Sequence, residues 1–270
     1  MRALVSVIIP SYNMAEYLSA SLDSALNAGV EDVEVIVVDD GSTDETESVI
    51  SQYIDPSNSR YDPRIRYIRQ SNQGKPGAVN SGLSASKGRF ITILDADDML
   101  PTKGLSMRCK ALEDEKKDLA IGGFEVVDER GATVGSRPIP DSPTSKVIRK
   151  QFCLSYKSPF HLGACLFSRS LYNKVGAFDK RLQRCQDIDY SLRLLREAKE
   201  IAWVDKAVYQ YRKYRGSYLD RAKVRLRTLW HRPAVYWKNY RGGYRYIAVF
   251  VGVALDTGKL VYESIGNYKS

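Results

Sequence analysis

The sequence predicts an α/β fold with an open, mostly parallel sheet and helices on both faces. Two predominantly apolar runs, residues 5–9 and 33–38, end abruptly at Pro10 and at Asp39. Short apolar runs of this kind are typical of strands that are buried on both faces of a parallel sheet. Each run is followed by a segment with helical periodicity, and strands that alternate with helices form parallel sheets.

The first hundred residues repeat this alternation. Apolar residues recur at helical spacing over residues 18–26, and Gly29 stands where a C-cap belongs. Ser42 and Glu45 have the spacing of a capping box, which predicts a second helix from Ser42 to Ile54. The other predicted elements are strands at residues 65–68, 90–94, 119–127, 162–168 and 201–211, and helices at residues 77–85, 171–176 and 187–198.

Composition and cysteine spacing favour a cytoplasmic protein. The four cysteines are far apart without a CxxC pair, and the chain has two histidines, which argues against a disulfide framework and a zinc site. The apolar run before Pro10 is too short for the core of a signal peptide. The longest apolar stretch, residues 246–255, is about half of what a membrane-spanning helix requires. We therefore expect a cytoplasmic protein without an integral membrane helix.

The net charge of +9 is concentrated near the C-terminus. Residues 206–245 contain twelve Lys or Arg and a single acid, Asp220, together with seven tyrosines and two tryptophans. Cations interleaved with interfacial aromatic residues are typical of segments that lie on a membrane surface. A solvated basic face that covers the rest of the protein is the alternative interpretation, and no nucleic-acid partner is expected.

Three carboxylates follow the predicted strand at residues 90–94. Carboxylates that crowd a strand end repel one another and contribute nothing to a core, so a cation is their expected partner. Asp95 and Asp97 are separated by one residue, which in an extended segment directs both side chains to the same side. This spacing suits a hydrated Mg²⁺ or Mn²⁺ that carries the phosphates of a ligand. Asp98 is interpreted as the N-cap of the next helix.

Polar residues also occupy other places at the rim of the predicted sheet, where ligands of open α/β sheets bind. Asp39 and Asp40 follow the second strand and could accept hydrogen bonds from a base or ribose, although turn formation would also explain them. The glycine-rich residues 72–80 open a helix, a geometry that suits phosphates or a nucleoside. They lack the GxxxxGK[ST] and GxGxxG motifs, which argues against kinase-like and dehydrogenase functions.

Asp187 lies near the start of the predicted helix at residues 187–198. The positive end of the helix dipole stabilises its charge there and keeps the carboxylate ionised at neutral pH. An ionised carboxylate at a pocket rim can serve as a general base. N-capping of the helix is the alternative role, and Asp187 and Asp189 could divide the two roles between them.

Taken together, these segments resemble the signature blocks of the family 2 inverting glycosyltransferases. The matching blocks are residues 5–13 (VSVIIPSYN), 37–44 (VVDDGSTD), 72–74 (NQG) and 94–98 (LDADD), in order and at suitable spacing. Residues 163–167 and 175–179 extend the resemblance, because similar segments line the acceptor region in that family. The resemblance covers roughly residues 4–217 and is most specific in the first hundred.

The resemblance implies a GT-A fold, with residues 1–98 as the nucleotide-sugar-binding half and residues 99–217 as the acceptor half. Beyond it, the composition predicts a basic, aromatic and helical extension at residues 218–270. It implies a nucleotide-sugar donor, with a UDP-sugar favoured, and Mn²⁺ or Mg²⁺ as cofactor. By motif matching, Asp95 and Asp97 are the metal-binding pair and Asp187 is the catalytic base. The implied donor-binding residues are Pro10, Tyr12, Asn13, Asp39, Asp40, Asn72, Gly74, Lys75, Asp95 and Ala96.

Three positions depart from the family pattern. Gln186 stands where the family usually has Glu beside the base, and Val79 stands where many members have Arg. Tyr214 replaces the His of the family's Tyr-Arg-x-His segment, so it is not expected to touch the metal. Arg212, Lys213 or Arg215 could bind the diphosphate instead.

We therefore expect a metal-dependent inverting transferase that moves a hexosyl or N-acetylhexosaminyl group to a hydroxyl of a saccharide or lipid-linked acceptor. It would act at the cytoplasmic face of the membrane, in the synthesis of cell-surface polysaccharides or glycoconjugates. Because Gln186 and Tyr214 loosen the match, the alternative is a non-catalytic nucleotide- or carbohydrate-binding protein that keeps the fold.

Overall fold

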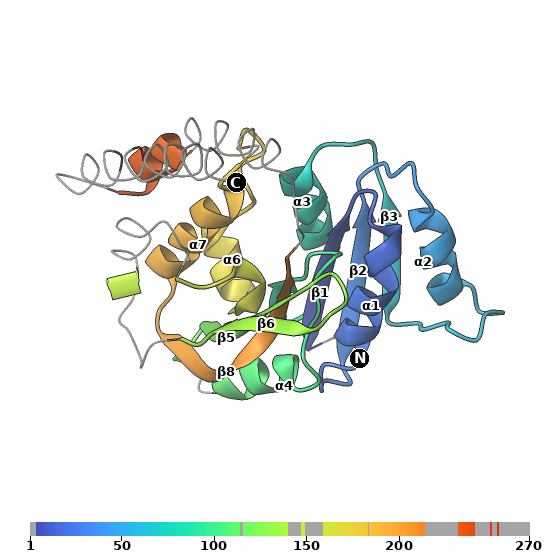
Figure 1. Ribbon diagram of the computed structural model, residues 1–270. Helices are drawn as coiled ribbons and strands as arrows, with labels where there is room; N and C mark the ends of the chain where they lie inside the picture. Colours follow the sequence, from blue (N-terminus) through green and yellow to red (C-terminus); the bar gives the residue numbers. More distant parts are fainter. Residues whose placement is uncertain are drawn as a thin grey trace, which may run out of the picture. The chain divides into compact units, whose positions relative to one another are not determined.

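The computed structural model describes residues 4–113, 116–139, 147–148, 159–182, 184–213, 232–240, 249 and 253 (Figure 1). The chain divides into two compact units. The first unit consists of Met1–Ser142, Phe160–Lys180 and Glu197–Lys213. The second consists of Pro143–Pro159, Arg181–Arg196 and Tyr214–Ser270. The domain boundary that the sequence predicts at residue 217 stays a prediction.

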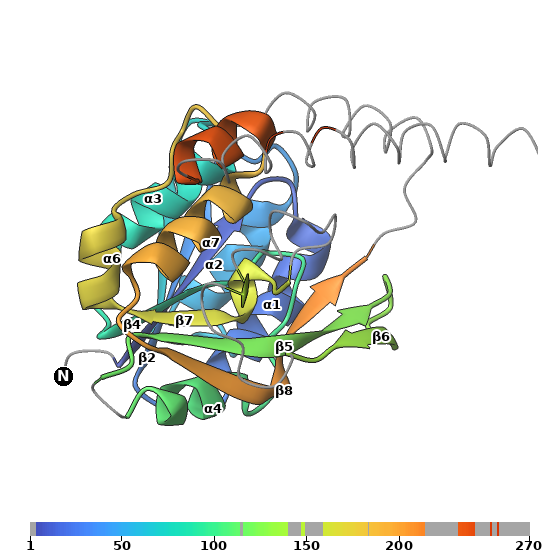
Figure 2. The ribbon, with the colours of Figure 1, turned by 90° about the vertical axis from the view of Figure 1, so that its left-hand side faces the viewer.

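Within the described residues, eight strands of the first unit form one sheet (Figures 1 and 2). The order along the sheet is β3-β2-β1-β4-β7-β5-β6, and β8 also pairs with β5. β1, β2, β3 and β4 are parallel to one another, as are β5 and β8, whereas β7 and β6 run antiparallel to their neighbours. The strands are β1 (Val5–Ser11), β2 (Val33–Asp39), β3 (Ile65–Arg69), β4 (Phe90–Ile93), β5 (Leu119–Val127), β6 (Thr133–Arg137), β7 (Cys165–Ser168) and β8 (Ile201–Arg212).

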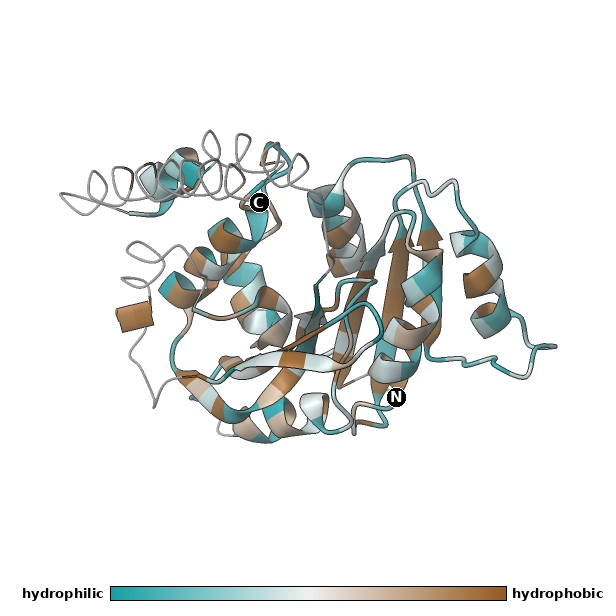
Figure 3. Ribbon diagram, viewed as in Figure 1, coloured by the Kyte–Doolittle hydropathy of each residue, from teal (hydrophilic) through white to brown (hydrophobic). Residues whose placement is uncertain are grey.

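Helices cover both faces of this sheet, as predicted. Val35 and Val37 of β2 belong to the main core with α1 (Ala15–Leu26) and α2 (Thr46–Ile54), whereas Ile36 and Val38 pack against Ala78 of α3 (Lys75–Ala85) on the other face. Successive residues of a strand point to opposite faces, which is why β2 is buried along its whole length. Figure 3 shows β1 and β2 as hydrophobic ribbons between helices of mixed character.

The remaining helices of the first unit lie in its second half. α4 (Gly104–Ala111) packs on β5 and β8 (Figure 2). The short η1 (Leu162–Ala164) occupies the start of the strand predicted at residues 162–168, and β7 forms its remainder. α6 (Arg169–Val175) follows β7 directly, and its first turn is capped by the Ser168 side chain, which accepts a hydrogen bond from the Leu171 N–H.

The start of α2 corrects the predicted capping box. The helix begins at Thr46 rather than at Ser42, and it is the Asp44 carboxylate that accepts hydrogen bonds from the N–H and hydroxyl of Thr46. The hydroxyl of Ser42 accepts a hydrogen bond from the Asn13 N–H instead. Asp44 also accepts a hydrogen bond from the Ala15 N–H at the start of α1, so one carboxylate satisfies the ends of two helices.

α7 (Gln186–Glu197) belongs to the second unit up to Arg196. One of its own residues, Asp189, is a buried acid that fixes the helix to its surroundings. The carboxylate of Asp189 accepts hydrogen bonds from Arg193 Nε and Asn239 Nδ2, at 2.9 Å and 2.8 Å. Asn239 belongs to a helical segment at residues 232–239, and Lys238 of the same segment lies 3.2 Å from Asp189. Most of the predicted basic extension lies outside the described residues. Within them, no helix is both long and apolar enough to cross a membrane.

Candidate active site

The carboxyl ends of β1, β2 and β4 meet at one edge of the sheet. Ser11 pairs with Asp39 across β1 and β2, and Ile8 of β1 pairs with Ile93 of β4. The loops that follow these three strands are therefore neighbours, as the pattern of polar strand ends predicts. Leu94 continues β4 with an N–H bonded to the Ile8 carbonyl, and the acidic loop begins directly after it.

Asp98 has the most buried carboxylate of this loop, and its predicted role as a helix cap is wrong. α4 begins at Gly104 with Lys103 at the N-cap position and no side-chain cap. Asp98 is 1% exposed and accepts hydrogen bonds from the Tyr209 hydroxyl at 2.5 Å and the Arg212 N–H at 2.7 Å. Burial, followed by the negative charges of the two other acids in the loop, raises its pKa to about 8.

Asp95 has the opposite electrostatic balance. Its Oδ2 lies 2.9 Å from Nζ of Lys75, the first residue of α3. Burial acts to raise the pKa of Asp95, but the positive charge of Lys75, with a smaller contribution from His161, brings this pKa below its usual value. Lys75, one of the predicted donor-binding residues, therefore pairs with the acidic loop after β4.

His161 is the functional candidate that the sequence analysis missed. One ligand atom each from Asp95, Asp98 and His161 lie within 4.8 Å of one another. The imidazole stacks on the ring of Tyr209 at a centroid distance of 4.7 Å, and Tyr209 in turn donates to Asp98. The available signal was that His161 lies two residues before a segment, residues 163–167, that resembles a family block.

These three side chains fit a divalent cation. Carboxylate oxygens suit Mn²⁺ and Mg²⁺, and imidazole is a common metal ligand. A cation would also relieve the repulsion between the acids, which adds to burial in raising the pKa of Asp98. Nδ1 of His161 accepts a hydrogen bond from the Gly163 N–H at 3.2 Å. To bind a metal through Nε2, the neutral ring has to carry its hydrogen on Nδ1 and release Gly163. Asp97, the predicted partner of Asp95, is half-buried and does not belong to this cluster. Its role as a metal ligand stays a prediction.

Arg212, which was predicted to bind a diphosphate, is 5% exposed and holds the acidic loop in place. Its guanidinium donates to the main-chain carbonyls of Asp97, Asp128 and Glu129, at 2.8, 3.2 and 2.7 Å. It also lies over the ring of Tyr17 at 5.0 Å. These contacts join the loop after β4 to the turn between β5 and β6. Of the other two predicted contacts, Lys213 is exposed and Arg215 lies outside the described residues.

Asp39 and Asp40 both stabilise the loops at this edge of the sheet. Asp39 is fully buried, and its two oxygens accept hydrogen bonds from the Ser42 N–H at 2.8 Å and the Tyr67 hydroxyl at 2.9 Å. Burial, then this carboxylate, raises the pKa of Tyr67. Asp40 accepts hydrogen bonds from the Gln70 side chain at 2.7 Å and the Gln73 N–H at 2.9 Å. Both acids thus shape the predicted site, and a direct contact with a nucleotide stays a prediction.

The other predicted donor-binding residues line this edge on separate loops. Asn13 has a positive φ of 53° and accepts a hydrogen bond from the Thr43 N–H, which ties the loop after β1 to the loop after β2. Tyr12 is exposed and Pro10 is half-buried, whereas Ala96 is buried. Asn72 accepts a hydrogen bond from the N–H of Gly74, whose φ of 77° turns the chain into α3.

Asp187, the predicted base, lies in the first turn of α7 in the second unit. Its neighbour Asp189 is fully buried and satisfied by Arg193 and Asn239, as described above. Asp189 therefore holds α7 through side-chain contacts, and N-capping of the helix by either acid stays a prediction. The role of Asp187 as a base stays a prediction.

Gly163 permits the close packing that positions Tyr209. A Cβ at this position would collide with the ring of Tyr209, which is fully buried. We expect Gly163→Ala to lower the free energy of unfolding by about 1–3 kcal/mol, because the ring must shift and weaken its bond to Asp98. Urea unfolding measures this loss. Gly135→Ala is the control, since the nearest neighbour of its Cβ lies at 3.9 Å, and an equal loss in both variants would contradict the packing argument.

Comparison with known proteins identifies the family. The family model described as glycosyl transferase family 2 matches residues 6–176, which is more than half of the chain. An uncharacterized glycosyltransferase of Rickettsia felis is 34% identical over 202 residues, 72% of this chain and 32% of the relative. The uncharacterized glycosyltransferase EpsJ of Bacillus subtilis is 27% identical over 78% of this chain and 62% of its own length. The matches thus span about a third and about three fifths of these relatives.

Solved structures show the same fold. S. aureus TarS in complex with UDP has a TM-score of 0.65 and 21% identity, over 90% of this chain and 67% of that one. The mannosyltransferase PcManGT of Pyrobaculum calidifontis, in complex with GDP-Man and Mn²⁺, has a TM-score of 0.67 and 18% identity, over 98% of this chain and 76% of that one. The fold is of the GT-A type. The predicted resemblance is confirmed, and the chain belongs to glycosyl transferase family 2.

Proposed function

We propose that this protein is a metal-dependent inverting glycosyltransferase. It takes a hexosyl or N-acetylhexosaminyl group from a nucleotide-sugar, with a UDP-sugar favoured, and transfers it to a hydroxyl of a saccharide or lipid-linked acceptor. The observation that carries the proposal is the group of Asp95, Asp98 and His161 at the carboxyl edge of the parallel strands, with Lys75 beside it. Packing alone does not explain acids and a cation gathered at this edge.

The known proteins support this choice of donor and cofactor. Solved structures of TarS contain UDP and UDP-GlcNAc, and the structure of PcManGT contains GDP-Man and Mn²⁺. All three ligands are nucleotides or nucleotide-sugars with a diphosphate, which is the group that a carboxylate-bound divalent cation recognises. The ligands in these structures of TarS and PcManGT differ in both base and sugar.

In the proposed reaction, Asp187 accepts the proton of the acceptor hydroxyl as its oxygen attacks the anomeric carbon of the donor. The bond from that carbon to the diphosphate oxygen breaks on the opposite side, so the configuration inverts and the nucleoside diphosphate leaves. Asp95, Asp98 and His161 would hold the cation, and Lys75 adds positive charge near the leaving group. When bound, Mn²⁺ or Mg²⁺ supplies charge stabilisation for the leaving diphosphate.

Calorimetric titration tests the donor and the cofactor together. We expect UDP-GlcNAc or GDP-Man to bind with an affinity that rises when Mn²⁺ is added, and slow hydrolysis of the bound donor to follow. The free energy of unfolding should rise by about 2.7 kcal/mol at a donor concentration of 100 times Kd. If neither these donors nor other nucleotide-sugars bind in the presence of Mn²⁺ or Mg²⁺, the proposal is wrong.

The basic extension supports a location on the membrane surface. The contact of Asn239 with Asp189 makes simple truncation unsuitable, because it would also unpair a buried acid in α7. Substitution of Lys223, Arg225 and Arg227 by Gln avoids this problem. Since each cation near an anionic surface contributes about 1 kcal/mol, the triple variant should bind anionic liposomes at least about tenfold more weakly in a sedimentation assay. Unchanged binding would leave the solvated basic face as the interpretation.

A further inference from the structure

Arg108 of α4 is a fully buried cation that has no part in the proposed reaction. Burial lowers the pKa of its guanidinium to about 10, which still leaves the charge in place at neutral pH. Within the described part of the chain, its hydrogen bonds go to main-chain carbonyls and one hydroxyl, and none goes to a carboxylate. A buried charge without an ionic partner is costly, so its position calls for an explanation.

The guanidinium of Arg108 joins two segments of the first unit. Its Nη1 donates to the Thr92 hydroxyl at 3.1 Å and to the carbonyls of Gly163 and Cys165, each at 3.0 Å. Its Nε donates to the Gly104 carbonyl at 2.9 Å, which ties the side chain to its own helix. The Thr92 hydroxyl donates in turn to the Cys165 carbonyl at 2.7 Å. A single side chain of α4 therefore bridges β4 to η1 and the start of β7.

This bridge lies where the ladder between β4 and β7 ends. The ladder pairs Phe90 with Ser168 and Ile91 with Phe167. Thr92 is the next residue of β4, and from there its hydroxyl and the guanidinium make the contacts between the two segments. Buried carbonyls that no ladder satisfies need another donor, which Arg108 supplies. The separation of the two segments at this point therefore depends on Arg108.

The two bridged segments carry the two halves of the candidate metal site. β4 leads into the acidic loop, where Asp95 follows Thr92 by three residues. On the other segment, His161 lies two residues before Gly163. A metal site made of ligands from separate segments keeps its geometry only if the groups behind the ligands fix their positions. The bridge occupies that place for both halves of the cluster.

We propose that Arg108 is the positioning residue of the metal site, because it sets the separation between the imidazole of His161 and the carboxylates of Asp95 and Asp98. The proposal rests on the metal-dependent function proposed above. Arg108 contacts neither the cation nor the donor, and it acts through the main chain of η1 and through Thr92. Without the guanidinium, η1 can shift relative to β4, and a cation that needs both segments binds more weakly.

Titration of the full chain with Mn²⁺ alone tests the proposal, with electron paramagnetic resonance to detect the free ion. Arg108→Met keeps the length of the side chain but removes its donors, and it should weaken Mn²⁺ binding roughly 10–100-fold. Arg108→Lys keeps donors on a single nitrogen, so a smaller loss of at least about threefold is expected. The Lys variant carries the test if the Met variant does not fold. Unchanged affinity in the folded variants would overturn the proposal.

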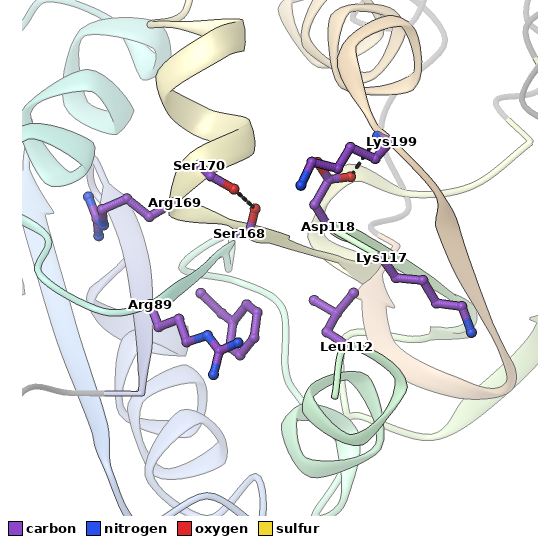
Figure 4. A pocket seen from close by; sticks show the side chains of 9 residues that line it. Arg89, Leu112, Lys117, Asp118, Ser168, Arg169, Ser170 and Lys199 are labelled. Carbon is purple, nitrogen blue, oxygen red and sulfur yellow. Dashed lines mark hydrogen bonds between the residues drawn. The ribbon is translucent and has the colours of Figure 1, made fainter. Parts of the chain in front are cut away.

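Arg169 provides the matched control at the other end of the same pair of strands. It follows Ser168 directly (Figure 4), and its guanidinium donates to the Gly88 carbonyl at 2.8 Å and the Ser86 hydroxyl at 3.0 Å. At about 3.3 Å per extended residue, this end of β4 lies roughly 16 Å from the acidic loop. Arg169→Met should therefore keep the affinity for Mn²⁺. An equal loss in the Met variants of both arginines would show a general loosening of the sheet and would contradict a specific role of Arg108.

A double-mutant cycle separates the positioning of His161 from a general effect on folding. His161→Ala removes the imidazole, so the separation that Arg108 sets no longer matters to the cation. The variant that combines Arg108→Met with His161→Ala should then bind Mn²⁺ as weakly as His161→Ala alone. Losses that multiply would show that Arg108 does not act through His161, and the proposal would be wrong.

The imidazole signals of the protein without metal give a readout that does not depend on binding. The chain has two histidines, His161 and His231, so His161→Ala assigns their nitrogen resonances. Arg108→Met should shift those of His161, whose Nδ1 accepts the Gly163 N–H, whereas Arg169→Met should not.

The outcomes distinguish the two proposals. If the unsubstituted protein binds neither Mn²⁺ nor Mg²⁺, the metal-dependent function fails and the role of Arg108 fails with it. If the unsubstituted protein binds Mn²⁺ and Arg108→Met binds it equally well with unchanged His161 signals, only the role of Arg108 fails.

Discussion

Replacement of Asp187 by Asn is expected to lower kcat by roughly 10²–10⁴-fold, the usual contribution of a general base, while the Kd of the donor stays unchanged. The substitution keeps the size of the side chain in the first turn of α7 and removes the charge that lets it accept the acceptor's proton. Asp189 is the neighbouring acid, but Arg193 and Asn239 occupy its carboxylate, so it is not expected to substitute for Asp187. Steady-state kinetics and donor titration of the same preparation measure the two quantities.

The control for this variant is Glu200→Gln, which neutralises an exposed acid just beyond the end of α7. It should leave kcat within experimental error of the unsubstituted protein. If Asp187→Asn has the same kcat as this control, Asp187 is not the base. A protein that binds donors but never transfers the sugar, with or without Asp187, would instead support the non-catalytic alternative.

Replacement of Asp95 by Asn is expected to abolish the effect of Mn²⁺ on donor affinity. Asp95 is the member of the acidic loop that contacts Lys75 and belongs to the cluster with Asp98 and His161. Asn at this position removes a negative charge from the cluster and weakens the pair with Lys75, so both the cation and the diphosphate lose a partner. Calorimetric titration of Mn²⁺ alone, then of the donor with and without Mn²⁺, measures the effect without relying on turnover.

Asp205→Asn serves as the matched control, because Asp205 is an exposed acid of β8 and does not belong to the cluster. It should retain the response to Mn²⁺, and both variants should keep the circular dichroism spectrum of the native fold. A response to Mn²⁺ that persists in Asp95→Asn would place the cation elsewhere. His161→Ala, measured in the same way, would then show whether the imidazole takes part in metal binding at all.

The strands that carry the site follow from local features of the sequence. Both faces of β1 and β2 are buried, which favours apolar residues at successive positions. The apolar runs in the sequence therefore predict these two strands. The alternation with helices then implies parallel pairing, since a parallel connection needs a crossover. From these two facts it follows that Asp39 and Asp95 lie at the same edge of the sheet, and the register of β1 with β2 and β4 agrees.

The structural role of Asp98 could not be predicted in the same way. Local sequence suggests a helix cap, because an acid precedes Pro101 and a helical segment. The groups that bind its carboxylate, Tyr209 and the Arg212 N–H, follow 111 and 114 residues later in the chain. The start of α2 is a similar case, because the Ser42 hydroxyl that completes the predicted capping box is bonded to Asn13. Contacts between distant segments decided both outcomes.

The sequence by itself indicated the family through the resemblance of its motif blocks. It also determined the parallel half of the sheet and the edge at which the acids gather, because these depend on the periodicity of burial and on local turn chemistry. Only the tertiary structure decided that His161 joins Asp95 and Asp98, that Arg212 binds main-chain carbonyls and that Asp189 is the structural acid of α7. The physical reason is that a side chain's partners are set by which segments pack together. β8 runs beside β5 and brings Tyr209 and Arg212 to Asp98 in the loop after β4. The residues that flank Tyr209 and Arg212 in the sequence do not predict this contact.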